Sequence, residues 1–92
     1  MAVDPPVDTD DELSAMAIEE LDSACALPWP DILKITPWGD SFNGFAPSGR
    51  EVEVVRRYLW AHDPEGIVAV EVEVRDLISR TGAEARALLT AP

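Results

Sequence analysis

Alternating apolar and polar residues over 52–60 and again over 68–74 predict two β-strands, because successive side chains of a strand point to opposite faces. The loop 62–66 joins these strands into an antiparallel hairpin. Closing Ala61 against Ile67 gives a register in which the numbers of paired residues sum to 128. This register places apolar residues opposite valines on one face and arginines opposite glutamates on the other. A slip by one residue would lose both sets of pairs, so we predict this register.

The N-terminal third of the chain has the pattern of an amphipathic helix. Apolar residues recur at spacings of three and four from Leu13 to Ala24. Thr9 and Glu12 have the spacing of a capping box, in which each side chain bonds a free backbone N–H at the start of a helix. Two prolines follow shortly afterwards and are expected to end the helix near Leu27.

Shorter patterns predict the elements between this helix and the hairpin. Ile32–Thr36 is a mainly apolar run closed by a proline, which predicts a short strand. Residues 38–41 and 47–49 have the composition of turns. Residues 42–46 between them predict a further strand, interrupted at Gly44 by a bulge or by the close approach of another backbone.

The end of the chain has the composition of a helix. Residues 76–80 are compatible with a single helical turn. Thr81 and Glu84 repeat the capping-box spacing, and residues 83–90 are all good or tolerable helix formers. A C-terminal helix is therefore predicted, with its apolar residues lying against the sheet.

These elements predict an α+β fold with an N-terminal helix, an antiparallel meander of three to four strands and a C-terminal helix. Both helices are expected to pack on one face of the sheet, and the other face, which carries charged residues, is expected to contact solvent. The chain then divides into a disordered acidic and proline-containing tail over 1–8 and a single domain over 9–92. A homodimer through an edge strand is compatible with this arrangement.

Composition limits the class of protein. The chain of 92 residues is long enough for one domain, and 47% hydrophobic residues is too high a share for uniform disorder despite the net charge of −11. No apolar run approaches the about 18 to 20 residues of a membrane span, and the acidic N-terminus differs from a secretory signal. The single cysteine, Cys25, excludes an internal disulfide. We therefore expect a cytoplasmic protein that does not bind membranes.

The distribution of charge is more informative than its sum. Nine of the 18 acidic residues lie within 1–31, where there is no lysine or arginine, and the rest of the chain has nine acidic and seven basic residues. A field of this kind repels nucleic acid and attracts basic surfaces, so direct binding of nucleic acid is not expected. Two interpretations stay open: the carboxylates solvate an exposed helix, or they dock on a basic protein partner.

Catalytic and metal-binding groups are scarce. His62, the only histidine, lies in a polar loop, and Cys25 has apolar neighbours and no nearby base. Neither glycine-containing turn matches a phosphate-binding loop. Four acidic residues have the spacing of a calcium loop, but Leu13 stands where that loop needs glycine; they are Asp8, Asp10, Glu12 and Glu19. We predict no enzymatic activity, no metal and no cofactor.

Two tryptophans lie in proline-flanked segments, where they either cap the core or anchor an interface at a small cost in side-chain entropy. Together with the acidic residues they support our leading hypothesis, a non-enzymatic interaction module that docks on a basic protein. Such a module would act as an adaptor, regulatory subunit or inhibitor, and in one version it imitates nucleic acid. The predicted partner-binding residues are Asp10, Asp11, Glu12, Glu19, Glu20, Trp29 and Trp38.

Arg56 departs from the strand pattern, because it lies on the valine face of the hairpin. Either its guanidinium reaches water at a sheet edge, or it turns inward and pairs with a carboxylate of the first helix. The inward arrangement supports an alternative function, a small-molecule site between sheet and helices in which Arg56 anchors an anionic group. The predicted ligand-binding residues are Arg56, Tyr58 and Trp60.

Overall fold

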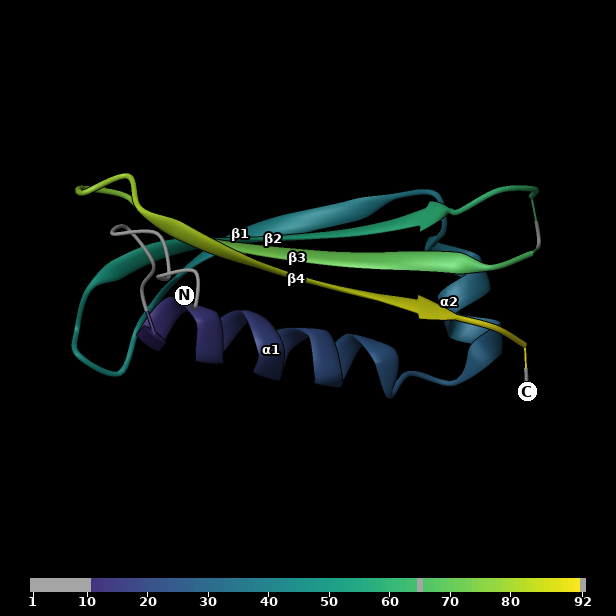
Figure 1. Cartoon of the computed structure of the whole chain (residues 1–92), viewed down its shortest axis with the longest axis horizontal. Coiled ribbons are helices and arrows are strands. Elements are labelled where there is room, and N and C mark those ends of the chain that lie inside the picture. The colour runs from purple at the N-terminus through teal and green to yellow at the C-terminus, as the bar shows by residue number, and fades with distance from the viewer. Residues whose placement is uncertain (1–10, 65, 92) are drawn as a thin grey trace, which may run out of the picture.

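The protein forms two helices followed by one four-stranded antiparallel sheet, as seen in a computed structural model that describes residues 11–64 and 66–91. The predicted tail over 1–8, the Thr9 cap and Asp10 lie outside the described residues. The sheet is a meander in which each strand pairs with the next (Figure 1). The elements are α1 (Asp11–Cys25), α2 (Trp29–Ile35), β1 (Gly39–Phe45), β2 (Glu51–Trp60), β3 (Val68–Asp76) and β4 (Gly82–Leu89).

The predicted hairpin and its register are confirmed. β2 and β3 pair Val54 with Val74 and Trp60 with Val68, so that paired numbers sum to 128 throughout. On the same face the valines of β3 are completely or almost completely buried. The alternation of side chains therefore decides which face of the sheet builds the core.

The predicted N-terminal helix is also confirmed, and it ends at Cys25, two residues before the expected position. It runs along one face of the sheet and packs against β3 and β4 (Figure 1). Its buried stripe consists of Leu13, Ala17, Leu21 and Ala24. Alanines on both α1 and β4 leave room for the helix to approach the sheet closely.

The predicted C-terminal helix is wrong, because residues 82–89 form strand β4. Ala83, Ala85 and Ala87 are half-buried against the core, while the residues between them are exposed. This period of two is the pattern of a strand, and pairing with β3 outweighs the high intrinsic helix propensity of alanine, glutamate and arginine. The predicted turn before it is present, with the Arg80 N–H donating to the Asp76 carbonyl at 3.1 Å.

The predicted strand over 32–36 is wrong as well, because residues 32–35 belong to helix α2 and Thr36 is its C-cap residue. Proline stands in the first turn of this helix, where its missing N–H costs no hydrogen bond, and Asp31 and Lys34 complement the helix dipole at the two ends. Ile32 is its buried residue. The Thr36 hydroxyl donates to the Ile32 carbonyl at 2.8 Å and so closes the last turn.

Strand β1 begins at Gly39, within the predicted turn 38–41, which is therefore wrong. Its register with β2 continues without interruption from Gly39 opposite Arg57 to Phe45 opposite Glu51, so the predicted bulge at Gly44 is absent. The close approach of backbones occurs at Gly39 instead, where a Cβ atom would lie 2.1 Å from the Arg56 carbonyl oxygen. The predicted turn 47–49 is confirmed, and Gly49 supplies its positive φ of 93°.

Candidate functional site

Three carboxylates line the side of α1 that faces away from the sheet. Asp11, Glu19 and Asp22 are all exposed, and none forms an ion pair with a residue that the structure describes. We refer to these three residues as the acidic ridge. Because helix geometry places them on one surface without an intervening base, their negative charge is directed into solvent.

The other predicted acidic residue in the first turn of α1, Glu12, points toward the sheet. Its carboxylate accepts hydrogen bonds from the Ser48 N–H at 2.9 Å and the Ser48 hydroxyl at 2.7 Å, and it lies 3.3 Å from Arg50. These bonds lower the pKa of Glu12, the Ser48 hydroxyl contributing most. Arg50 also binds Asp76 at 2.7 Å. Glu12 therefore ties the start of α1 to the turn between β1 and β2 and is not free to meet a partner.

Arg56 lies between two carboxylates on the core-facing side of the sheet. Its Nε donates to Asp40 at 2.8 Å, a second nitrogen of the same guanidinium binds the other Asp40 oxygen, and Nη1 lies 3.9 Å from Glu20 of α1. The guanidinium carbon is 5.2 Å from the centroid of the Phe42 ring. The hydrogen bond from Arg56 holds the pKa of Asp40 below its usual value, and the same bond raises the pKa of Arg56.

Neither of the two arrangements predicted for Arg56 describes this geometry completely. Its side chain is 28% exposed, so it is neither extended into water nor enclosed. The pairing with α1 is present through Glu20, but the stronger partner is Asp40, which faces Arg56 across the β1–β2 register. Asp40 is absent from both predicted sets of site residues, and only the register of β1, which depends on the 47–49 turn, could have placed it there.

A cleft of about 440 Å³ opens beside this ion pair, between the end of α2 and the start of β1. Trp38 is 66% exposed on its rim, and Tyr58, only 5% exposed, contributes to its wall. Burial raises the pKa of Tyr58, so its hydroxyl stays protonated at neutral pH. The cleft is mostly apolar, and its lining comprises Leu27, Lys34, Ile35, Trp38, Gly39, Asp40, Arg56 and Tyr58.

The structure groups the predicted partner-binding and ligand-binding residues differently from the sequence analysis. Trp38, predicted to bind a partner, lines the cleft together with Arg56 and Tyr58, which were predicted to bind a ligand. Trp29 and Trp60 are partly buried and pack against the core, so neither contributes to the lining of the cleft. Of the acidic residues predicted to bind a partner and described by the structure, only Glu20 reaches toward the cleft, through Arg56.

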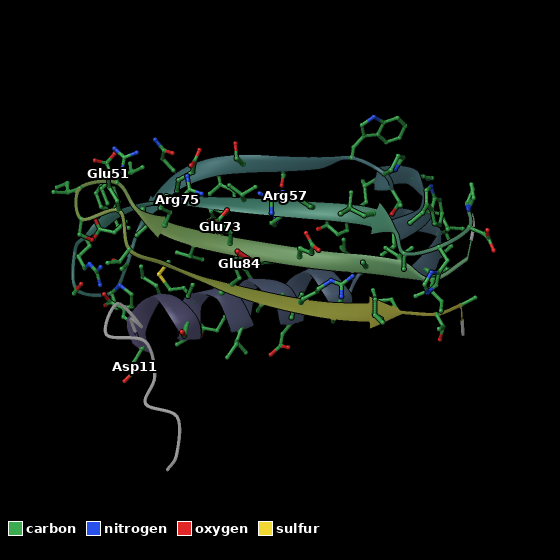
Figure 2. The ribbon with its side chains drawn as sticks, turned by 45° about the horizontal axis from the view of Figure 1, so that its top comes forward. Asp11, Glu51, Arg57, Glu73, Arg75 and Glu84 are labelled. Atoms are coloured by element: carbon green, nitrogen blue, oxygen red, sulfur yellow. The ribbon has the colours of Figure 1, made fainter. Side chains whose placement is uncertain are left out.

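The face of the sheet opposite α1 carries a network of paired charges. Figure 2 shows Arg57, Glu73 and Arg75 rising from the neighbouring strands β2 and β3 on this face. Glu73 lies 2.8 Å from Arg75 and 3.5 Å from Arg57. Glu71 lies 3.1 Å from Arg86 of β4 and 3.9 Å from Arg57. All three arginines of this face are therefore paired with carboxylates. Glu51, Glu53 and Glu84 of the same face form no ion pair with a described residue.

His62 and Cys25, for which we expect no catalytic role, lie in different parts of the structure. His62 is exposed in the β2–β3 loop. Cys25 is half-buried, and both burial and the charge of Asp22 raise the pKa of its thiol, which disfavours the nucleophilic thiolate. Within 11–64 and 66–91, no three histidine, cysteine or acidic side chains gather in a group that could hold a metal ion. No helix in the same ranges is long and apolar enough to cross a membrane.

Comparison of the chain with models of protein families, with curated proteins and with solved structures finds no match.

Proposed function

We propose that the protein is a non-enzymatic interaction module that binds a basic surface of another protein. In this proposal the acidic ridge of α1 makes the electrostatic contact, and Trp38 anchors the interface at the end of the molecule where α2 meets β1. Adaptor, regulatory subunit and inhibitor are the roles that this mode of binding would serve. We place the module in the cytoplasm, in keeping with its single unpaired cysteine.

The distribution of ion pairs is the observation that supports this proposal. Five of the seven basic residues are bound to carboxylates, and all five lie in or beside the sheet; they are Arg50, Arg56, Arg57, Arg75 and Arg86. The acidic ridge has no such partner among the described residues. The uncompensated charge of the molecule is therefore negative. Three of the carboxylates that carry it share one surface of α1, which favours encounter with a positively charged partner there, while the other described ones are spread over α2, the sheet and the β2–β3 loop; they are Asp31, Glu51, Glu53, Asp63 and Glu84.

Trp38 has the properties of an interface anchor. Its indole is largely exposed, yet the backbone on both sides is held by the end of α2 and by the first pair of β1, where the Tyr58 N–H donates to the Trp38 carbonyl at 2.9 Å. A large rigid side chain on a fixed backbone loses little entropy when it is covered. Exposed tryptophans of this kind often contribute much of the free energy of binding.

The proposal predicts that neutralising the ridge abolishes salt-sensitive capture of a partner. We expect the triple variant Asp11→Asn, Glu19→Gln, Asp22→Asn to capture about one tenth or less of the amount of partner that the wild-type protein captures. The pull-down is done at about 0.1 M salt, and the reason for the decrease is that the charge that attracts the partner is lost. Quantitative mass spectrometry of the bound fraction measures this difference. Raised salt should release the same partner from the wild-type protein.

The matched control is Glu51→Gln, Glu53→Gln, Asp63→Asn, which changes the net charge equally at sites away from α1. It should capture the partner as well as the wild-type protein does. Equal loss in both variants would mean that only the total charge matters, and unchanged capture by the ridge variant would refute docking through α1. Trp38→Ala should weaken binding of the isolated partner at all salt concentrations, since its contribution is apolar.

A second candidate function is binding of a small anionic molecule in the cleft, favoured by the meeting of Arg56 and Tyr58 in its lining. Because Asp40 already neutralises Arg56, the positive charge available to an anion comes from Lys34, which forms no ion pair with a described residue. Phenylacetate is a suitable probe, since it combines an aromatic ring with a carboxylate. It should shift the NMR signals of Trp38 and Tyr58 saturably in the millimolar range.

The Lys34→Ala variant should weaken this binding by about tenfold, whereas Arg80→Ala, which removes an exposed base from the β3–β4 turn, should not. Shifts that do not saturate, or that are the same in both variants, would exclude an anion site in the cleft.

A further inference from the structure

Strand β4 is an edge strand whose outer backbone groups are unpaired within the sheet. The Asp76 N–H donates to the Thr81 carbonyl at 2.8 Å, which makes this a hydrogen-bonded pair of the antiparallel β3–β4 ladder. Because such pairs recur at every second residue, the odd-numbered residues of β4 bond β3. The N–H and C=O groups of the even-numbered residues therefore point away from the sheet; these residues are Gly82, Glu84, Arg86 and Leu88.

This edge lacks the features that usually prevent pairing with another strand. Residues 82–89 contain no proline and no lysine, and their register with β3 is continuous, without a bulge. The two charged residues of β4, Glu84 and Arg86, have opposite signs and lie two positions apart on the face opposite α1. An edge of this kind is a template for a further strand.

The sequence of β4 is complementary to itself in one antiparallel register. When Ala85 of two copies meets at a two-fold axis, Glu84 of each copy lies opposite Arg86 of the other. Shifting the register by one pair in either direction places Glu84 opposite Glu84, or Arg86 opposite Arg86, and like charges directly opposite are destabilising. Charge complementarity therefore selects this register from those that the outward backbone groups allow.

The side chains around this axis fit a close approach. Arg86 donates its Nε to Glu71 at 3.1 Å, and its two terminal nitrogens bond no residue in the described part of the chain. They are available to the carboxylate of a facing Glu84, which forms no ion pair with any described residue. On the core-facing side Ala85 of one copy lies opposite Ala85 of the other, and Ala83 lies opposite Ala87. No bulky side chain therefore opposes the pairing.

Helix α1 offers an apolar contact beside the same edge. Glu12 and Glu20 lie on the flank of α1 that faces β2, where they meet Arg50 and Arg56. Helix geometry places Ile18 and Cys25 on the opposite flank, and Cys25 indeed lines a small cavity together with Leu89 at the end of β4. Ile18 is 54% exposed. A two-fold axis at Ala85 brings this flank of α1 toward the same flank of the second copy.

We propose that the protein forms a homodimer by antiparallel pairing of β4 with β4 of a second copy, centred on Ala85, which joins the two sheets into one of eight strands. Glu84–Arg86 pairs across the axis set the register, and Ile18 of each α1 is covered on the side below the sheet. This arrangement goes beyond the proposed binding function. Asp11 and Asp22 lie seven and four residues from Ile18 on the same stripe of α1, so the acidic ridges of the two copies approach each other, and their repulsion should make the dimer more stable as salt is raised.

The edge formed by β1 does not share these properties. The Tyr58 N–H bonds the Trp38 carbonyl, so the even-numbered residues of β1 bond β2 and the odd-numbered ones point outward. The outward set contains no charged residue that could select a register; it consists of Gly39, Ser41, Asn43 and Phe45. We therefore assign the dimer to β4 and use β1 as the matched control.

Charge exchange provides the decisive experiment, performed by size-exclusion chromatography with light scattering and by sedimentation at about 0.15 M salt. The wild-type protein should be a dimer at concentrations of tens of micromolar. Glu84→Arg and Arg86→Glu should each raise the dimer dissociation constant by about 100-fold, because every cross-axis pair becomes a repulsion. An equimolar mixture of the two variants should form a heterodimer, since opposite charges then face each other again.

Proline variants test the strand itself without relying on charge. Glu84→Pro removes an outward N–H and spares the bonds to β3, so it should give a folded monomer; folding is checked by circular dichroism. Asn43→Pro makes the same change on β1 and should leave the dimer intact. A wild-type monomer at all concentrations, a dimer lost with Asn43→Pro but not Glu84→Pro, or variants that fail to form the heterodimer would each overturn the proposal.

Discussion

Replacing Gly39 by alanine is expected to destabilise the folded protein by about 1 to 3 kcal/mol, the usual range for a side chain forced into filled space. The added Cβ atom would lie 2.1 Å from the Arg56 carbonyl oxygen and 3.0 Å from the Arg57 Cα atom. Both neighbours are backbone atoms of β2, so relief requires the start of β1 to move away from β2. Urea unfolding measures the loss, and the bond between the Asp40 carboxylate and Arg56 should weaken with it.

Gly44 of the same strand is the control. A Cβ atom at this position meets nothing within 4 Å, so Gly44→Ala should leave stability unchanged or raise it by up to about 1 kcal/mol, since alanine loses less backbone entropy than glycine on folding. If the two substitutions had equal effects, the close approach of β1 to β2 at Gly39 would be wrong.

Replacing Asp76 by alanine is expected to lower the midpoint of thermal unfolding by about 5 to 10 °C, a large effect for a domain of this size. Its carboxylate accepts hydrogen bonds from the backbone N–H groups of Ile78 at 2.7 Å and Ser79 at 2.9 Å, and it binds Arg50 at 2.7 Å. Loss of these bonds releases the β3–β4 turn and also frees Arg50, which holds Glu12 of α1. Asp63→Ala in the exposed β2–β3 loop should have little effect.

The contribution of Asp76 should depend on pH in a defined direction. Its bonds to Ser79 and Ile78, and then to Arg50, lower its pKa from 3.8 to about 2. Since the folded state favours the carboxylate, this stabilisation is complete above about pH 4 and is lost as the pH falls toward 2. The difference in stability between the wild-type protein and Asp76→Asn should shrink over this interval. A difference that is constant from pH 6 to pH 2 would contradict the assigned bonds.

The helix and the hairpin that the sequence predicts correctly are those in which the spacing of apolar residues is compatible with only one secondary structure. In the β2–β3 hairpin, the valines of one face and the opposed charges of the other both require the same register, so no tertiary information is needed. In α1, the buried residues from Leu13 to Ala24 follow helical spacing without exception. Both patterns reflect burial of one face, which is the dominant local signal in a globular chain.

The predictions fail where intrinsic propensity and tertiary pairing disagree. Residues 82–89 are good helix formers, but the free edge of β3 offers backbone hydrogen bonds to a strand, and their alternation of alanine with exposed residues fits that edge. Residues 32–36 are short and apolar, a length at which helix and strand have the same appearance. Their helix depends on Pro30 and Asp31 in the first turn and on packing of Ile32 into the core.

At the candidate site, too, the sequence predicts part of the arrangement and the fold decides the rest. The excess of carboxylates in the first helix is visible in the sequence, but only the fold separates the ridge of Asp11, Glu19 and Asp22 from Glu12 and Glu20, which meet arginines of the sheet. The partnership of Asp40 with Arg56 likewise follows from the β1–β2 register, not from their spacing along the chain. The meeting of Trp38 with Tyr58 in one cleft depends on where α2 places the start of β1.

The sequence by itself determined the charge of this protein, the position of its first helix and the pairing of its central hairpin. Each of these depends on local composition or on the spacing of apolar residues, which shows directly which face of a helix or strand is buried. Tertiary structure decided the fate of the C-terminal segment, the identity of the sheet edges and which carboxylates remain unpaired. These outcomes depend on contacts between residues distant in the chain, whose energies no local pattern contains.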